Sequence, residues 1–137
     1  MISVKLFDGN IIIAKKILKL RNKKKIISWT ISKKTVLYKE HINWIKKFKK
    51  RNLLYIIYFK KNFAGYLRIE KDQTTKVSWA VEEKFQRKFI FYKILKKYVK
   101  TKYLAYIIKE NISSLITALK AGFKIHKVKK KYLILKI

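Results

Sequence analysis

Cysteine and proline are absent from this chain of 137 residues, and only three glycines and two histidines occur in it. Without cysteine there is no disulfide framework and no thiolate zinc site, and two histidines are too few for an all-protein transition-metal site. Because proline and glycine are scarce, polar clusters must mark the turns between elements. Nothing in this composition calls for an oxidising compartment, so we expect a cytoplasmic protein.

Acidic residues are also scarce, with seven Asp and Glu against 37 Lys and Arg, which gives a net charge of +30. Hydrophobic residues still make up 50% of the chain, so it is not of the disordered type. The length predicts one domain over residues 1–137. The longest apolar runs, such as Leu53–Phe59, are far shorter than the roughly 20 residues that cross a bilayer, and the first residues lack the pattern of a secretory signal.

The excess of positive charge admits polyanions as partners, because lysines that bind phosphates release counterions. The lysines are spread along the whole chain, however, whereas a dedicated nucleic-acid binder concentrates its charge on one element. A coding bias towards lysine and isoleucine would give the same composition. Both interpretations stay open, and binding of nucleic acid would in either case be non-specific.

Hydrophobic periodicity predicts an α/β order of strands and helices. Strands are expected at residues 2–7, 53–59, 63–69, 76–81, 103–108, 123–128 and 132–137. Helices are expected after Asp8-Gly9-Asn10, over residues 38–50 and 86–100, and after the N-cap Asn111. In the last helix Ile112, Leu115, Ile116 and Leu119 share one side, and Gly122 is the left-handed stop.

Three short segments carry a resemblance to a known family: Ala80-Val81 before a basic helix start, Gly65-Tyr66 in a central strand, and Asn111-Ile112-Ser113-Ser114 followed by Lys120-Ala121-Gly122-Phe123. In this order and separation they resemble the GNAT superfamily of acyl-CoA-dependent N-acyltransferases, over most of the chain. The resemblance implies a mixed, mostly antiparallel central sheet flanked by about four helices. It also implies acetyl-CoA as co-substrate and transfer of the acetyl group to a primary amine.

In that family a loop of the pattern Q/R-x-x-G-x-G/A cradles the CoA pyrophosphate with the backbone N–H groups of a helix N-terminus. The matching stretch here is Gln86-Arg87-Lys88-Phe89-Ile90-Phe91, in which Phe89 and Phe91 replace the glycines. The rings could crowd the phosphates, while Arg87 and Lys88 add positive charge. The residues implied to contact acetyl-CoA are Val81, Gln86, Arg87, Lys88, Phe89, Ile90, Phe91 and Asn111. An ordinary cationic helix start is the alternative.

The family often uses a tyrosine, four residues before the glycine of the Gly-Phe pair, as general acid towards the leaving thiolate. Ala118 occupies that position. An active enzyme would need another group or a water molecule to protonate the sulfur. The alternative is a catalytically degenerate module of the same fold that binds through its positive charge.

The N-terminal half narrows the resemblance to GNAT enzymes that acetylate nucleotide-linked amino sugars, including those of the pseudaminic acid pathway. It rests on Arg21-Asn22, on Ile26 or Ile27, and on the run from Lys39 to Ile45. The implied substrate, a UDP- or dTDP-linked amino sugar, would contact Arg21, Asn22 and Trp44. His41, with Glu40 nearby, would act as the base that takes its proton or as a substrate ligand.

Several alternatives to this narrower interpretation stay open. The acceptor could instead be a protein N-terminus, and a homodimer is compatible with the resemblance. Arg21 could direct its guanidinium to solvent, and His41 could be a packed helix residue beside Trp44. His126 has no partner that the sequence identifies, so we expect a structural role for it.

Overall fold

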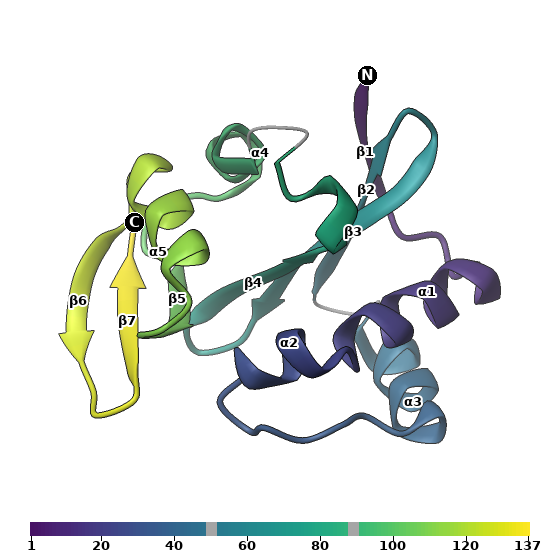
Figure 1. Ribbon diagram of the computed structural model, residues 1–137, viewed down its shortest axis with the longest axis horizontal. Helices are drawn as coiled ribbons and strands as arrows, with labels where there is room; N and C mark the ends of the chain where they lie inside the picture. The colour runs from purple at the N-terminus through teal and green to yellow at the C-terminus, as the bar shows by residue number, and fades with distance from the viewer. Residues whose placement is uncertain (49–51, 88–90) are drawn as a thin grey trace.

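The computed structural model describes residues 1–48, 52–87 and 91–137 (Figure 1). Along the chain the elements are β1 (Ile2–Leu6), α1 (Ile11–Arg21), α2 (Lys24–Ser28), α3 (Tyr38–Phe48), β2 (Leu53–Phe59), β3 (Asn62–Lys71), β4 (Thr75–Val81), the 3-10 helix η1 (Glu83–Phe85), α4 (Phe91–Tyr98), β5 (Leu104–Ile108), α5 (Ile112–Lys120), β6 (Lys124–Val128) and β7 (Tyr132–Lys136). None of the described helices combines the length and apolar character that crossing a bilayer requires.

The strands form one seven-stranded sheet in the order β1-β2-β3-β4-β5-β7-β6. Neighbouring strands run antiparallel, with the exception of β4 and β5, which are parallel. A parallel pair needs a crossover between its strands, and η1 and α4 provide it. The predicted α/β fold with a mixed, mostly antiparallel sheet is therefore confirmed.

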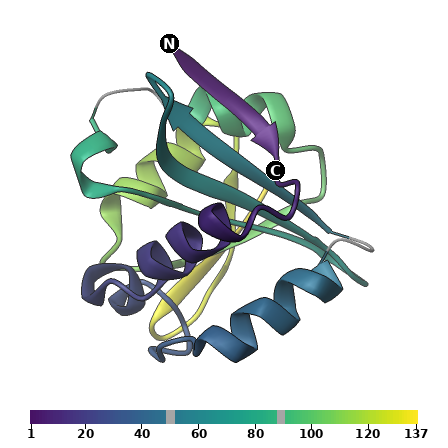
Figure 2. The same ribbon diagram turned by 90° about the vertical axis from the view of Figure 1, so that its right-hand side faces the viewer.

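The sheet separates two hydrophobic cores, one on each face (Figure 2). The larger core lies under α4 and α5 and includes Leu95, Ala118 and Phe123. The smaller core lies under α1 and is formed around Ile17 and Leu20, with Trp44 of α3 packed against it. Successive residues of a strand point to opposite faces, so β2 contributes Ile56 to the smaller core and Ile57 to the larger one.

The helix ends follow the capping signals in the sequence. Asn10 starts α1, and its side-chain oxygen accepts hydrogen bonds from the N–H groups of Ile12 at 2.9 Å and Ile13 at 3.2 Å. Asn111 caps α5 in the same way, through the N–H of Ser114 at 3.3 Å. Gly122 follows α5 with a φ of 105°, the left-handed conformation predicted for it.

Three features differ from the predicted elements. The short helix α2 is not among the predicted helices, and the helix predicted over 86–100 is the shorter α4, preceded by η1. Residues 49–50 of one predicted helix and residues 88–90 of another lie outside the described residues. On α5 most of the apolar side does not face the core, because Ile112, Ile116 and Leu119 are exposed, while Ala118 is fully buried and Leu115 packs against the larger core. The small side chain of Ala118 lets the helix lie close to the sheet.

Gly65 marks the closest approach between the central strands. It lies opposite Val81 in the β3–β4 pairing, beside a shift in the β2–β3 register between Ile57 and Tyr58. A β-carbon at this position would overlap the carbonyl oxygen of Ala80 and lie 3.0 Å from the Cα of Val81. Only glycine therefore fits here without displacing β4.

We expect Gly65→Ala to lower the free energy of unfolding by about 2 kcal/mol, because the backbone of β4 must shift to admit the methyl group. Urea denaturation followed by circular dichroism measures this change. Gly122→Ala is the comparison, since there the β-carbon meets only the Ile137 side chain at 3.7 Å and the expected loss, about 1 kcal/mol, comes from the positive φ. A more stable Gly65→Ala protein would contradict the close approach.

Candidate functional site

Strands β4 and β5 diverge from each other along their length. The structure pairs them only at Lys76 and Leu104, close to where each begins, among the residues it describes. Beyond this pair the two strands border a cavity of about 810 Å³, lined by residues 77–81 of β4 and 105–107 of β5. The end of β4 and the end of β5 are thus opposite walls of one cavity.

The backbone of β4 presents hydrogen-bonding groups to this cavity. The N–H of Glu82 points towards β3, where it donates to the carbonyl of Ala64 at 2.7 Å. Peptide groups alternate in direction along a strand, so those of Val81 and Trp79 point the other way, towards the gap. The side chain of Gln86 donates to the carbonyl of Val81 at 3.2 Å, so this oxygen has a partner even though no strand pairs with it.

The start of α5 forms the wall on the β5 side. Asn111 is buried and lines the cavity, and its cap on the N–H of Ser114 holds the first turn of the helix. Ser113, Ser114 and Thr117 line the cavity with their polar side chains. Ala118 does not line it and lies fully buried in the larger core, so no hydroxyl replaces the family's tyrosine at this position.

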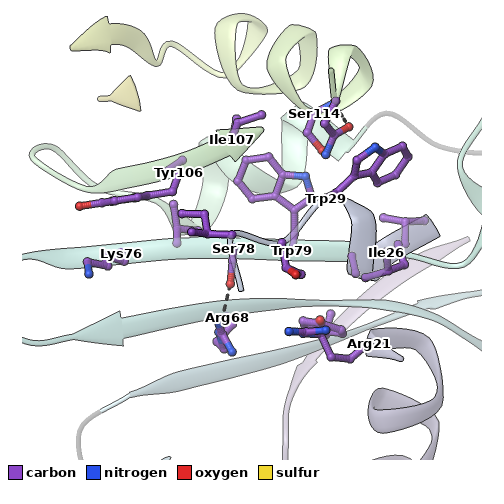
Figure 3. A pocket seen from close by; sticks show the side chains of 18 of the residues that line it. Arg21, Ile26, Trp29, Arg68, Lys76, Ser78, Trp79, Tyr106, Ile107 and Ser114 are labelled. Carbon is purple, nitrogen blue, oxygen red and sulfur yellow. Dashed lines mark hydrogen bonds between the residues drawn. The ribbon is translucent and has the colours of Figure 1, made fainter. Parts of the chain in front are cut away.

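All three tryptophans of the chain line this cavity. Figure 3 shows the rings of Trp29 and Trp79 on the side of β4 that faces Ser114. The Trp79 ring is stacked on Phe91 of α4, with 5.9 Å between the ring centroids. Trp44 lies on the other face of the sheet, under the guanidinium of Arg68, which is 5.4 Å from its ring centroid. Aromatic rings therefore line the cavity on both faces of the sheet.

Two arginines lie on the opposite side of β4 from Trp79 (Figure 3). Arg68 donates to the Ser78 hydroxyl at 3.0 Å and forms an ion pair with Glu70 at 2.8 Å. Arg21, at the end of α1, donates to the carbonyl of Lys34 at 3.3 Å, and none of the ion pairs between described residues includes it. Burial lowers the pKa of Arg21; the charge of Tyr66 opposes this shift, and Arg68 adds to it.

Solved structures with the same arrangement of elements confirm the fold. The protein yncA of Salmonella typhimurium, solved with its cofactor acetyl-CoA, aligns at 15% identity and a TM-score of 0.79, over 99% of this chain and 92% of its own. Spermidine N-acetyltransferase of Vibrio cholerae, solved with CoA and spermine, aligns at 12% identity and a TM-score of 0.79, over 98% and 92%. The chain has the GNAT fold.

The N-acetyltransferase PseH of Campylobacter jejuni, solved with acetyl coenzyme A, aligns over 100% of this chain and 98% of its own, at 16% identity and a TM-score of 0.69. No protein-family model matches the chain, and no curated protein matches its sequence. At these identities the likeness shows the GNAT fold and leaves substrate and activity to be argued from the residues themselves.

The cavity of this GNAT fold brings together most of the residues singled out in the sequence. Its lining includes Arg21, Glu40, His41, Trp44, Val81, Gln86, Phe91 and Asn111. Arg87 and Asn22 do not line it, and Asn22 instead bonds to the backbone of Val36. Lys88, Phe89 and Ile90 lie outside the described residues. The sequence did not single out Trp29, Arg68 or Trp79 as site residues, because only the tertiary arrangement brings them to the cavity.

His41 and Glu40 are neighbours on α3 but differ in exposure. His41 is 4% exposed, stacks on Trp44 at 5.9 Å, and bonds through Nε2 to the carbonyl of Ala14 at 2.8 Å. Because a carbonyl can only accept, Nε2 carries the proton and the ring ties α3 to α1. Burial lowers the pKa of His41, and the bond to Ala14 offsets part of this shift. Glu40 is exposed, and its role and that of His41 in catalysis stay predictions.

The lowered pKa of His41 has a consequence for stability. Below about pH 6.5 the unfolded chain binds a proton at this ring more readily than the folded protein does, so the free energy of unfolding decreases as the pH falls through this range. We expect His41→Gln to remove this part of the pH dependence between about pH 7 and pH 5.

Urea denaturation at several pH values measures the effect. His126→Gln is the matched control, because it removes the chain's other histidine from the exposed strand β6. An unchanged slope of stability against pH in His41→Gln would contradict a buried, neutral imidazole.

Proposed function

We propose that the protein is an N-acetyltransferase that moves an acetyl group from acetyl-CoA to a primary amine, and that this amine is carried by a nucleotide-linked sugar. The divergence of β4 and β5 carries the proposal, because it opens a cavity between two strands that would otherwise be hydrogen-bonded. Solved proteins of the same fold hold acetyl-CoA or CoA.

The residues present fit the co-substrate. A pantetheine arm is narrow and carries amide groups, so the backbone of β4 around Trp79 and Val81 can bond to it as a neighbouring strand would. The diphosphate would lie near the start of α4, where helix N–H groups attract anions. Gln86 and Arg87 precede this helix in the chain and could bond to the phosphates. The ring of Phe91 packs on Trp79 within the wall, so it leaves the cavity open.

The chemistry then depends on placement. Acetyl-CoA, when bound, supplies an acetyl group activated as a thioester, which a neutral amine can attack. The β4 peptide N–H groups that face the gap can donate to the thioester oxygen as negative charge develops on it. The cavity continues from there to Arg21, Glu40 and Trp44, so an acceptor held by these residues reaches the acetyl group from one side.

Proton transfer is assigned to groups that the cavity exposes. Glu40 takes the proton of the acceptor ammonium, because it lines the cavity and none of the ion pairs between described residues includes it. His41 lies beside it with Nε2 committed to Ala14. As the amide forms, the nitrogen loses its second proton, and this proton passes to the leaving thiolate through water, with the Thr117 hydroxyl able only to relay it, since Ala118 has no proton to give. A Glu40→Gln enzyme with an unchanged kcat would remove the first assignment.

The acceptor class follows from the side chains on the α1–α3 side of the cavity. Arg21 is a half-buried cation that no described carboxylate neutralises, and Arg68 lies nearby, which favours an acceptor that carries a phosphate or diphosphate. The ring of Trp29, which lines the cavity, suits the flat, partly apolar face of a sugar ring or a base. An amine on a nucleotide-linked sugar combines these two properties.

Filling the gap between β4 and α5 is expected to abolish co-substrate binding. Ser114 lines the cavity beside Trp79, and we expect Ser114→Trp to weaken acetyl-CoA binding at least about tenfold, because the added indole occupies the space. Isothermal titration calorimetry at low salt measures the affinity. Ile116→Trp is the control, since it adds the same indole to the exposed side of α5. If the unaltered protein shows no affinity for acetyl-CoA, the proposed function is wrong.

Removing the charge of Arg21 tests the acceptor class. With UDP-glucosamine as acceptor, we expect Arg21→Gln to raise KM about tenfold or more, through loss of a charge-assisted bond to phosphate. With glucosamine, which has no phosphate, the two enzymes should be equally poor. Lys19→Gln is the control, because it removes an exposed cation from the same helix. Acetylation of N-terminal peptides alone would reject the sugar-nucleotide acceptor and leave the acetyltransferase.

A further inference from the structure

The part of the cavity that faces the acceptor has a wall without regular secondary structure. Residues 29–36, between α2 and α3, form this segment, which we call the acceptor wall. Five of its residues line the cavity: Trp29, Thr30, Ile31, Ser32 and Val36. A segment outside any helix or strand has no ladder of backbone hydrogen bonds, so its shape depends on a few individual contacts.

Asn22 supplies two of these contacts with one side chain. Its Oδ1 accepts from the N–H of Val36 at 2.8 Å, and its Nδ2 donates to the carbonyl of Val36 at 2.8 Å. The amide therefore pairs with both polar backbone groups of one residue, as a neighbouring strand would. Asn22 itself caps the end of α1, where its own N–H bonds to the carbonyl of Leu18 at 3.0 Å. The far end of the wall is in this way fixed to α1.

Other hydrogen bonds fix the rest of the wall to α1 and α2. Arg21 donates to the carbonyl of Lys34 at 3.3 Å, so two adjacent residues at the end of α1 hold the segment. Within the wall, the Thr30 hydroxyl donates to the carbonyl of Ile27 at 2.7 Å and accepts from the N–H of Lys33 at 3.1 Å. Val36 lines the cavity and Asn22 does not, so Asn22 holds the wall from behind a residue that reaches the cavity.

We propose that Asn22 is a positioning residue that holds the acceptor wall in the shape that binds the acceptor, without touching the acceptor itself. This replaces the direct substrate contact that the sequence suggests for Asn22, and it rests on the proposed function. An acceptor that meets a loosened wall must order it on binding, so its apparent affinity falls. On the proposed function acetyl-CoA would lie against β4 and α5, and Trp29 is the residue of this wall that Figure 3 shows on the same side of β4 as Ser114.

Hydrogen exchange followed by mass spectrometry tests the structural half of the proposal, whether or not the protein proves to be an acetyltransferase. We expect Asn22→Ala to raise exchange in residues 29–37 at least about tenfold while β3 and β4 stay protected, and to leave acetyl-CoA affinity within about twofold. Thr30→Val is the second variant, and it should raise exchange near Lys33 while the Val36 amide stays protected by Asn22.

Steady-state kinetics with UDP-glucosamine tests the functional half. Asn22→Ala should raise the acceptor KM about tenfold with kcat within about threefold, because chemistry at the thioester does not involve the wall. The matched control is Asn52→Ala, which removes a similar bond from the N–H of Lys71 to Asn52 Oδ1, at 2.6 Å and away from the cavity lining, and should leave both constants unchanged.

Two outcomes would overturn the proposal. One is unchanged exchange at residues 29–37 in Asn22→Ala, and the other is exchange that rises throughout the protein together with a loss of acetyl-CoA affinity. If no amine is acetylated by the unaltered protein, the proposed function fails. Local loosening in Asn22→Ala would in that case still show that Asn22 positions the wall.

Discussion

The separation of β4 from β5 is the constraint on which the rest of the site depends. Each strand is held by a different neighbour: β4 pairs with β3 over its whole length, and β5 pairs with β7 over its own. Among the described residues, no backbone ladder joins the two strands beyond Lys76 and Leu104. The larger core continues beneath both strands under α4 and α5, so the sheet remains one body while its middle stays open.

The order of elements could be predicted because local signals agree with the tertiary structure. Alternating apolar residues mark the strands, while Asn111 and Gly122 mark the limits of α5. The orientation of α5 could not be predicted in this way. Its isoleucines and Leu119 form a regular stripe in the sequence, yet the sheet requires a small residue at the contact, and Ala118 takes that place. Periodicity identifies an amphipathic helix but does not say how closely it must approach its neighbour.

The residues of the candidate site also fall into two groups, those that the sequence identified and those that only the structure showed. Arg21, His41 and Asn111 were found from the sequence through resemblance to a family, and all three line the cavity. Arg68 and Trp79 sit in ordinary alternating strands, and Trp29 sits in an irregular segment, so no local signal separates them from core or surface residues. Asn22 shows the opposite case, since its place beside Arg21 suggested substrate contact while its side chain serves the backbone of Val36.

The gathering of every tryptophan around one cavity has an optical consequence. Indole emission shifts in colour and intensity with the polarity of its surroundings, and here no indole lies elsewhere in the chain to dilute the signal. Trp29 and Trp79 lie on the side of β4 that faces Ser114, whereas Trp44 lies under the guanidinium of Arg68. The unlabelled protein is thus its own fluorescent reporter for whatever small molecule enters between its strands.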